Sequence, residues 1–188
     1  MSPGRWGYRV RQFFETLFAH PTPADLELVR ETLTPAQAAL FRQLQPSEQA
    51  HAVRVLRAVQ ETCQANGMEP PADLLAAALL HDLGKTRYPL RIWERVMIVL
   101  GKAILPTFAA RWGREDSTRP PRGWARPFVI AAHHPGWGAN MAAEQGTAPR
   151  AVALIRRHQD PLPPHRLSEN SNEEDRLLAI LQAVDDES

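Results

Sequence analysis

The sequence contains a single cysteine, Cys63, and so lacks the pair needed for an intramolecular disulfide. This excludes the small disulfide-stapled secreted domains and favours a reducing compartment, so we expect a cytoplasmic protein. An excess of charge of either sign is also missing, because the formal net charge is +1. The composition gives no sign of the broad basic surface of nucleic-acid binders, and we expect no nucleic-acid partner.

Long uninterrupted apolar runs are absent as well. The first 20 residues are basic and apolar, but Glu15 interrupts them and no small-residue cleavage site follows, so they do not form a signal peptide. The most apolar later stretch, 92–110, contains three charged residues and Pro106. A membrane-spanning helix needs about 20 mostly apolar residues. We therefore expect no transmembrane segment and interpret 92–110 as a buried helix.

Strand signals are few. Alternating β-branched or aromatic runs hardly occur, and Ala, Leu, Arg, Glu and Gln dominate the periodic segments. The sequence predicts an all-α fold, a single globular helical domain of about eight to nine helices. Divided at Pro and Gly, the expected helices cover 10–19, 23–32, a segment after Thr34-Pro35, 47–65, a segment from 71 to the His81-Asp82 pair, 126–132, 139–145, 149–158 and a last segment from 172. The expected loops cover 117–123 and 161–172.

Histidines are the most informative residues. Four of the seven, His51, His81, His134 and His158, fall on apolar helical segments, where an imidazole without polar partners is costly. An aspartate follows His81 directly, and another lies near the end of the chain. Imidazole and carboxylate are common ligands of divalent cations, and facing helices of a bundle often assemble them. The pattern therefore favours a metal site in the helical core.

Three stretches carry a resemblance to a known family: SEQAHAVRVL around His51, LLAAALLHDLGK around His81 and Asp82, and LLAILQAVDDES around Asp185. In this order they resemble the HD-domain metal-dependent phosphohydrolases, in which a His, a His-Asp doublet and a distant Asp come from three helices. The resemblance covers about 51–185. It implies that these four residues are metal ligands and that Lys85 contacts the substrate phosphate.

Two further stretches are similar to the extended, histidine-rich subgroup of that family, which holds a second metal. They are AAHHPGWGANMA, with His134, and VALIRRHQD, with His158. The subgroup commonly has two adjacent histidines at the second position, where this chain has His158 followed by Gln159. His133 is an alternative to His134 as the ligand. By this resemblance, a two-metal site favours phosphodiesters or cyclic nucleotides as substrates. A four-ligand site favours nucleotide phosphatase activity.

By this resemblance the protein is a metal-dependent phosphohydrolase. A metal-activated water would cleave a phosphomonoester or phosphodiester, with nucleotides among the candidate substrates, and Asp82 would orient that water. The implied cofactor is one or two divalent ions, and the sequence does not distinguish Fe, Mn, Mg, Co, Ni and Zn. The substrate is expected to be a small phosphorylated molecule.

Cationic side chains near the motif are candidates for holding the substrate phosphate. Arg54 lies one turn beyond His51 on the same helix, and residues three apart on a helix are neighbours. Arg87 follows Lys85 by two positions. Because arginine can make two parallel contacts to a phosphate, we place Arg54 and Arg87 beside Lys85 as candidate substrate-binding residues.

We expect residues 1–46 to form a helical extension that packs on a metal-binding unit of residues 47–188, as one structural unit. The N-terminal helices are also a candidate surface for a homodimer. An alternative function keeps the metal ligands without catalysis: an inactive HD-type module that binds metal or another ligand and regulates a partner.

Overall fold

The computed structural model describes residues 19–114, 120–161 and 172–187. Within these ranges the chain forms nine α-helices and two short 3₁₀ helices, with no strand, so the all-α prediction is confirmed. The expected first helix lies almost wholly outside the described residues, as do most of the expected loop 161–172 and residues 117–119 of the expected loop 117–123. The division into an extension (1–46) and a metal-binding unit (47–188) stays a prediction.

The helices follow one another closely along the chain. In order they are α2 (Pro23–Thr32), α3 (Pro35–Phe41), α4 (Pro46–Ala65), α5 (Ala72–Leu80), η1 (Leu83–Arg87), α6 (Ile92–Ile104), α7 (Pro106–Trp112), η2 (Gly123–Ala125), α8 (Arg126–Glu144), α9 (Pro149–Arg157) and α10 (Glu173–Glu187).

Local sequence signals account for several helix ends. The hydroxyls of Thr22 and Thr34 each accept a hydrogen bond from a backbone N–H three residues later, and Pro occupies the first helical position of α2 and α3. A capping hydroxyl satisfies one of the free donors at a helix start, and a proline there loses no hydrogen bond. Helix α4 ends just before Gly67, which adopts a left-handed φ of 65°. Such a turn favours glycine.

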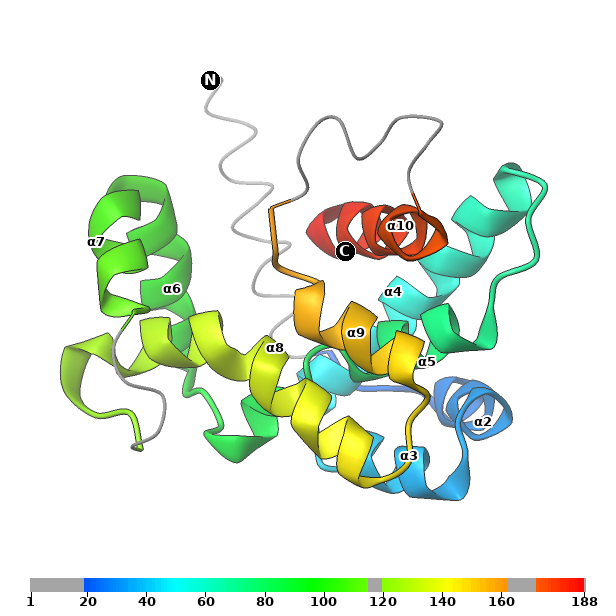
Figure 1. Ribbon diagram of the computed structural model, residues 1–188. Helices are drawn as coiled ribbons and strands as arrows, with labels where there is room; N and C mark the ends of the chain where they lie inside the picture. The colour runs from blue at the N-terminus through cyan, green and yellow to red at the C-terminus, as the bar shows by residue number, and fades with distance from the viewer. Residues whose placement is uncertain (1–18, 115–119, 162–171, 188) are drawn as a thin grey trace, which may run out of the picture.

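The main hydrophobic core lies where α4, α5, α9 and α10 meet. Helix α5 contacts both α4 and α9, and α10 contacts α4 and α9. Leu74, Leu79 and Leu80 of α5 are fully buried there, as are Leu177 and Leu178 of α10. Figure 1 shows these four helices gathered on one side of the molecule, with α6 and α7 beyond the other end of α8. The apolar run of α5 thus places the His81-Asp82 pair at the edge of the core.

Helix α8 corrects the expectation of two helices at 126–132 and 139–145. The structure has one helix, Arg126–Glu144, with Pro135 inside it. Proline lacks the N–H that would bond to the carbonyl four residues earlier, that of Ala131. The ring Nδ1 of His134 lies 3.1 Å from that carbonyl oxygen and 3.1 Å from the carbonyl oxygen of Ile130, so its N–H is shared between the two. The side chain therefore replaces the lost backbone bond, and the helix continues.

The stretch 92–110 also differs from its expectation as a buried helix. It forms two helices, α6 and α7, that meet at Leu105, because Pro106 begins a new helix. Only one side of α6 packs on the rest of the protein, where Glu94 pairs with Arg126 of α8. Several large apolar side chains of α6 and α7 are exposed. No helix in the described ranges is long and apolar enough to cross a membrane.

Candidate metal centre

The six expected ligands come from five helices and their ends. Four stand at or next to the end of a helix, and two stand within one. His81 caps the C-terminus of α5, Asp82 directly precedes η1, His158 caps α9 and Asp185 is in the last turn of α10; His51 is in α4 and His134 in the middle of α8. Residues separated by up to 134 positions are thereby brought together.

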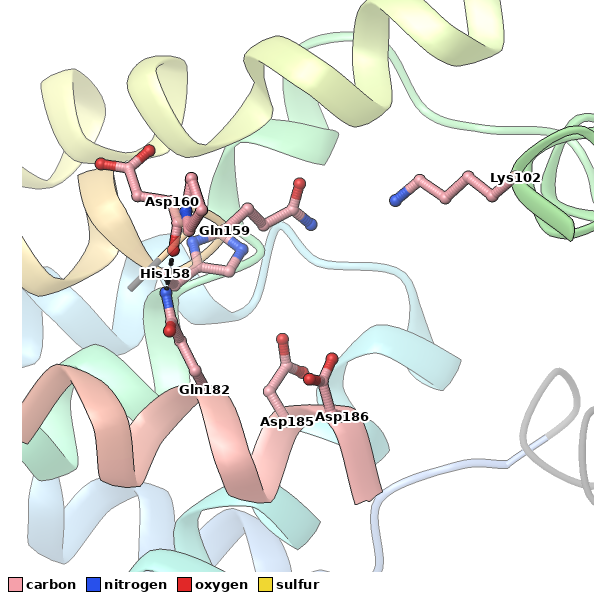
Figure 2. Close-up of a pocket in the computed structure, with 8 residues that line it drawn as sticks. Lys102, His158, Gln159, Asp160, Gln182, Asp185 and Asp186 are labelled. Carbon is pink, nitrogen blue, oxygen red and sulfur yellow. Dashed lines mark hydrogen bonds between the residues drawn. The ribbon is translucent and has the colours of Figure 1, made fainter. Parts of the chain in front are cut away.

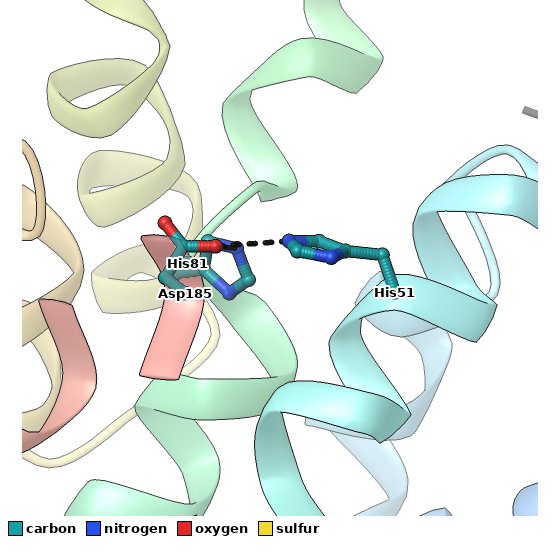
Figure 3. Close-up of side chains that lie close together, drawn as sticks. All are labelled: His51, His81 and Asp185. Carbon is teal, nitrogen blue, oxygen red and sulfur yellow. Dashed lines mark hydrogen bonds and ion pairs between the residues drawn. The ribbon is translucent and has the colours of Figure 1, made fainter. Parts of the chain in front are cut away.

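The first group consists of His51, His81 and Asp185. Figure 3 shows the Asp185 carboxylate beside the His81 ring, with a dashed line joining it to the ring of His51. Its Oδ1 lies 2.9 Å from Nε2 of His51 and 3.3 Å from Nε2 of His81. One oxygen and two imidazole nitrogens thus converge within 4.8 Å of one another. This donor set is one that divalent transition metals accept.

The second group consists of Asp82, His134 and His158, all buried. Oδ1 of Asp82 lies 3.2 Å from Nε2 of His134, and the rings of His134 and His158 are 5.2 Å apart. The two groups adjoin, because the ring of His81 is 5.2 Å from that of His158 and Nε2 of His81 is 3.6 Å from Oδ2 of Asp82. The doublet residues therefore stand between the groups.

Backbone contacts set the orientation of three of these rings. Nδ1 of His81 donates to the carbonyl of Ala78, and Nδ1 of His158 donates to that of Ile155, as Nδ1 of His134 does within α8. The opposite nitrogen, Nε2, is buried in all three and makes no well-aligned hydrogen bond, although a carboxylate oxygen lies 3.3 Å from it in His81 and 3.2 Å from it in His134. A buried polar atom without a partner is costly, and an Nε2 lone pair is a metal ligand when Nδ1 carries the proton. The residues present fit a bound divalent cation.

The charges of the site favour a cation as well. Burial opposes the charged form of His81, but the carboxylates of Asp82 and Asp185 outweigh it and raise the pKa of His81 to about 9. Burial, followed by the nearby rings of His81 and His134, lowers the pKa of His158 to about 3. Burial tends to raise the pKa of Asp185, yet His81 and His51 hold it well below its ordinary value. The two carboxylates therefore stay ionised and attract positive charge.

Contacts outside the two groups hold their helices in place. Arg157 at the end of α9 pairs with Asp175 and Glu174 of α10. Gln182 of α10 donates to the backbone carbonyls of Arg157 and Asp160, at 3.1 and 2.8 Å. These contacts fix the end of α9, which carries His158, against the helix that carries Asp185.

Histidines 133 and 134 occupy different surroundings. His134 is the one that the structure brings to Asp82 and His158. The ring of His133 instead stacks on Trp137, with 5.9 Å between ring centres and 29° between planes. Adjacent residues of a helix point about 100° apart, so only one of the two can face the centre.

The expected phosphate-binding cations fall in three different places. Nζ of Lys85 lies 2.6 Å from Oδ2 of Asp82, directly beside the second group. Arg54 is half-buried on α4, and its Nη2 is buried without a hydrogen-bond partner. Arg87 is exposed, and its guanidinium lies over the ring of Trp137, 5.5 Å from its centre. Arg87 thus contacts an aromatic ring rather than either His/Asp group.

A pocket of about 370 Å³ opens beside the first group. His158, Gln182 and Asp185 line one wall, and Lys102 of α6 lines the other. Figure 2 shows the Lys102 side chain extending from its helix toward these residues. No sequence signal marks this lysine, because it sits in an apolar stretch 20 positions after Asp82 and only the fold brings α6 opposite α10.

Comparison with known proteins agrees with this geometry. The sequence model of the HD domain matches residues 49–187, which include all six residues of the two groups. No curated protein and no solved structure matched the chain. HD domains bind divalent metals, and both His/Asp groups can hold one. The match spans well over half of the sequence, and the chain therefore belongs to the HD-domain family.

Proposed function

We propose that this protein hydrolyses a phosphoric ester with the help of divalent metal held by the two His/Asp groups. HD domains are in general metal-dependent phosphohydrolases, and the pocket beside the first group has a volume suited to a small molecule. The proposed substrates are phosphomonoesters or phosphodiesters, including nucleotides.

One observation carries this proposal: the two groups adjoin at His81 and Asp82. Two separate sets of three donors stand side by side, with the Asp82 carboxylate in one set and 3.6 Å from His81 of the other. A single structural metal would need only one set, and structural sites are normally closed by four protein ligands. Sets of three leave room for water and substrate.

In this proposal Asp82 is the central catalytic side chain. Metal bound by these ligands would lower the pKa of a coordinated water to about 7 and so supply the nucleophile. Asp82 would accept a hydrogen bond from the attacking water and orient it. Its carboxylate suits this role because Lys85 and His81 outweigh the effect of burial and hold the pKa of Asp82 well below its ordinary value. The group therefore stays an acceptor at neutral pH.

Cations near the two His/Asp groups and the pocket would hold the phosphate. Lys85 stands beside Asp82, where it can contact a phosphoryl oxygen next to the attacking water. Arg54 carries a buried nitrogen without a partner, one turn from His51. Lys102 faces the first group across the pocket, as Figure 2 shows, and we propose it as a further anchor for the anionic end of the substrate. Arg87, engaged with Trp137, we place at the periphery of substrate binding.

The test combines metal analysis with a panel of phosphoesters. Protein purified without chelator should contain divalent metal and hydrolyse at least one nucleotide, monoester or diester substrate when Mn, Fe, Mg, Co, Ni or Zn is supplied. His81→Ala and Asp82→Ala should lose metal and hydrolysis while keeping wild-type helix content by circular dichroism. Metal binding without turnover on the whole panel would reject the enzyme in favour of an inactive HD-type regulatory module.

A further inference from the structure

Helices α6 and α7 present an exposed apolar surface, which we call the hairpin face. Its largest members are Ile92, Trp93, Val99, Leu100, Ile104 and Phe108, and Ile104 is 68% exposed. Among the described residues, every large hydrophobic side chain with strong exposure belongs to these helices, to Leu105 between them or to Trp124. Exposed apolar residues gathered in this way mark an interaction site.

The orientation of the hairpin face is fixed by what packs on the opposite side of α6. Glu94 is buried and pairs with Arg126 of α8. Gly101 lies against Phe128, since a Cβ at Gly101 would be 2.6 Å from the Phe128 ring. Arg95 pairs with Glu48 of α4 at 2.7 Å. These three residues of α6 thus face the protein, as does Ile98, which packs against a buried cluster. The exposed apolar residues of the hairpin face lie on the other side of the helix.

The stretch around this surface is strongly basic. Residues 87–126 contain nine basic and three acidic residues, whereas the whole chain has a net charge of only +1. Of the three acids, Glu94 is buried, and Glu115 and Asp116 lie outside the described residues. Five of the basic residues are exposed along the hairpin and its connections: Arg91, Lys102, Arg111, Arg114 and Arg122. The apolar surface therefore lies in a part of the chain where basic residues outnumber acidic ones.

The exposed apolar residues and the flanking cations together narrow the choice of binding partner for the hairpin face. A symmetric contact with a second copy would place the same basic residues of both chains against each other. Residues 1–18 are a poor match as well, because they carry three arginines and one glutamate. A surface of anionic lipid satisfies both features: apolar side chains enter the boundary between headgroups and acyl chains, and the flanking cations meet lipid phosphates.

We propose that the α6–α7 hairpin docks this protein on an anionic membrane surface. Trp93 on α6, and Trp124 with 76% exposure before α8, supply the aromatic rings that settle at headgroup level. Figure 1 shows the hairpin projecting away from α4, α5 and α10, so it can meet a flat surface without their interference. Lys102 lies on α6 and also lines the pocket, so docking would hold the mouth of the pocket near the lipid.

Vesicle co-sedimentation of the full chain tests the proposal. The wild-type protein should pellet with vesicles of phosphatidylcholine and phosphatidylglycerol, and stay in solution with phosphatidylcholine alone. The double variant Ile104→Ser/Phe108→Ser should bind at least about tenfold more weakly, because both exposed side chains lose their burial in lipid. Arg111→Gln and Arg114→Gln should each weaken binding about fivefold, and added salt should weaken it further. Arg42→Gln, which changes an exposed arginine at the end of α3 and outside the hairpin, is the matched charge control and should bind as the wild type does.

Two results would overturn the proposal. One is wild-type protein that does not pellet with the anionic vesicles, or a serine double variant that pellets equally well. The other is a concentration-dependent dimer in light scattering that the double variant abolishes while vesicle binding is absent, which would assign the face to a second copy. Thermal melting of each variant checks that it is folded. Because binding is measured without metal or substrate, the result is independent of the proposed hydrolase activity.

Discussion

A Cβ atom placed on Gly84 would lie 1.9 Å from the backbone carbonyl oxygen of His134. The turn after the His81-Asp82 pair therefore touches the backbone of α8 at the residue that contributes an imidazole to the second group. The contact is mutual, since a Cβ on Gly138 of α8 would lie 2.8 Å from the backbone nitrogen of Gly84. The spacing between Asp82 and His134 depends on these two glycines.

Replacement of Gly84 by alanine should therefore separate η1 from α8. We expect a loss of about 3 kcal/mol or more in the free energy of unfolding, because the clash is with backbone that cannot rotate away. Bound metal should fall as well. Gly136→Ala on α8 is the control: the nearest atom to its Cβ is 3.9 Å away, at the end of the Arg156 side chain. It should stabilise the helix by about 0.5–1 kcal/mol. Urea unfolding measures the stability of both variants. A Gly84→Ala protein of wild-type stability would contradict this account.

The two His/Asp groups should lose metal separately. His51→Ala removes a donor from the first group only, and His158→Ala removes one from the second only. Each variant should hold less metal per chain than the wild type, while retaining what the intact group binds. His133→Ala should leave the metal content unchanged, because His133 contacts Trp137 instead. Elemental analysis decides the matter, and a metal loss in His133→Ala equal to that in His158→Ala would refute this assignment.

Lys102→Met should raise the KM for an anionic substrate about fivefold and leave kcat within about twofold, because a cation on the far wall binds ground state and transition state alike. Arg30→Gln on α2 serves as the charge control, since Arg30 is exposed and pairs with its neighbour Glu27. Steady-state kinetics on the best substrate of the panel is the measurement. A KM equal to that of the wild type would show that Lys102 does not bind the substrate.

Stability at acid pH should depend on Asp25, which joins α2 to α4 through Arg57. Burial tends to raise the pKa of Asp25, but hydrogen bonds from Thr22 and the charge of Arg57 bring it below its ordinary value of 3.8. A carboxyl whose pKa is lower in the folded state stabilises the fold above its unfolded pKa, and this contribution is lost as the pH falls through the folded value.

The wild type should accordingly melt at a higher temperature than Asp25→Asn at neutral pH, and the difference should shrink below about pH 4. Glu27→Gln, on the same helix with an exposed ion pair, should change the melting temperature little at any pH. A difference that stays constant from pH 7 to pH 3 would show that Asp25 acts through packing rather than through charge.

The sequence by itself determined the helical fold, the starts of α2 and α3 and the ligand candidates. These depend on local physics: a threonine or proline acts within one turn, and a histidine in an apolar helix has few alternatives to a partner. The HD pattern joined His51, His81, Asp82 and Asp185 without coordinates, and the family match agrees with it.

Only the tertiary structure decided which of His133 and His134 lies beside Asp82 and His158, because neighbours on a helix differ solely in which element they face. The same holds for the continuity of α8 through Pro135, where a side chain replaces a backbone hydrogen bond. It holds for the apolar stretch 92–110, whose exposure follows from what packs on the other side of α6. Hydrophobicity indicates that a helix needs a partner surface, but packing alone determines whether the protein supplies one.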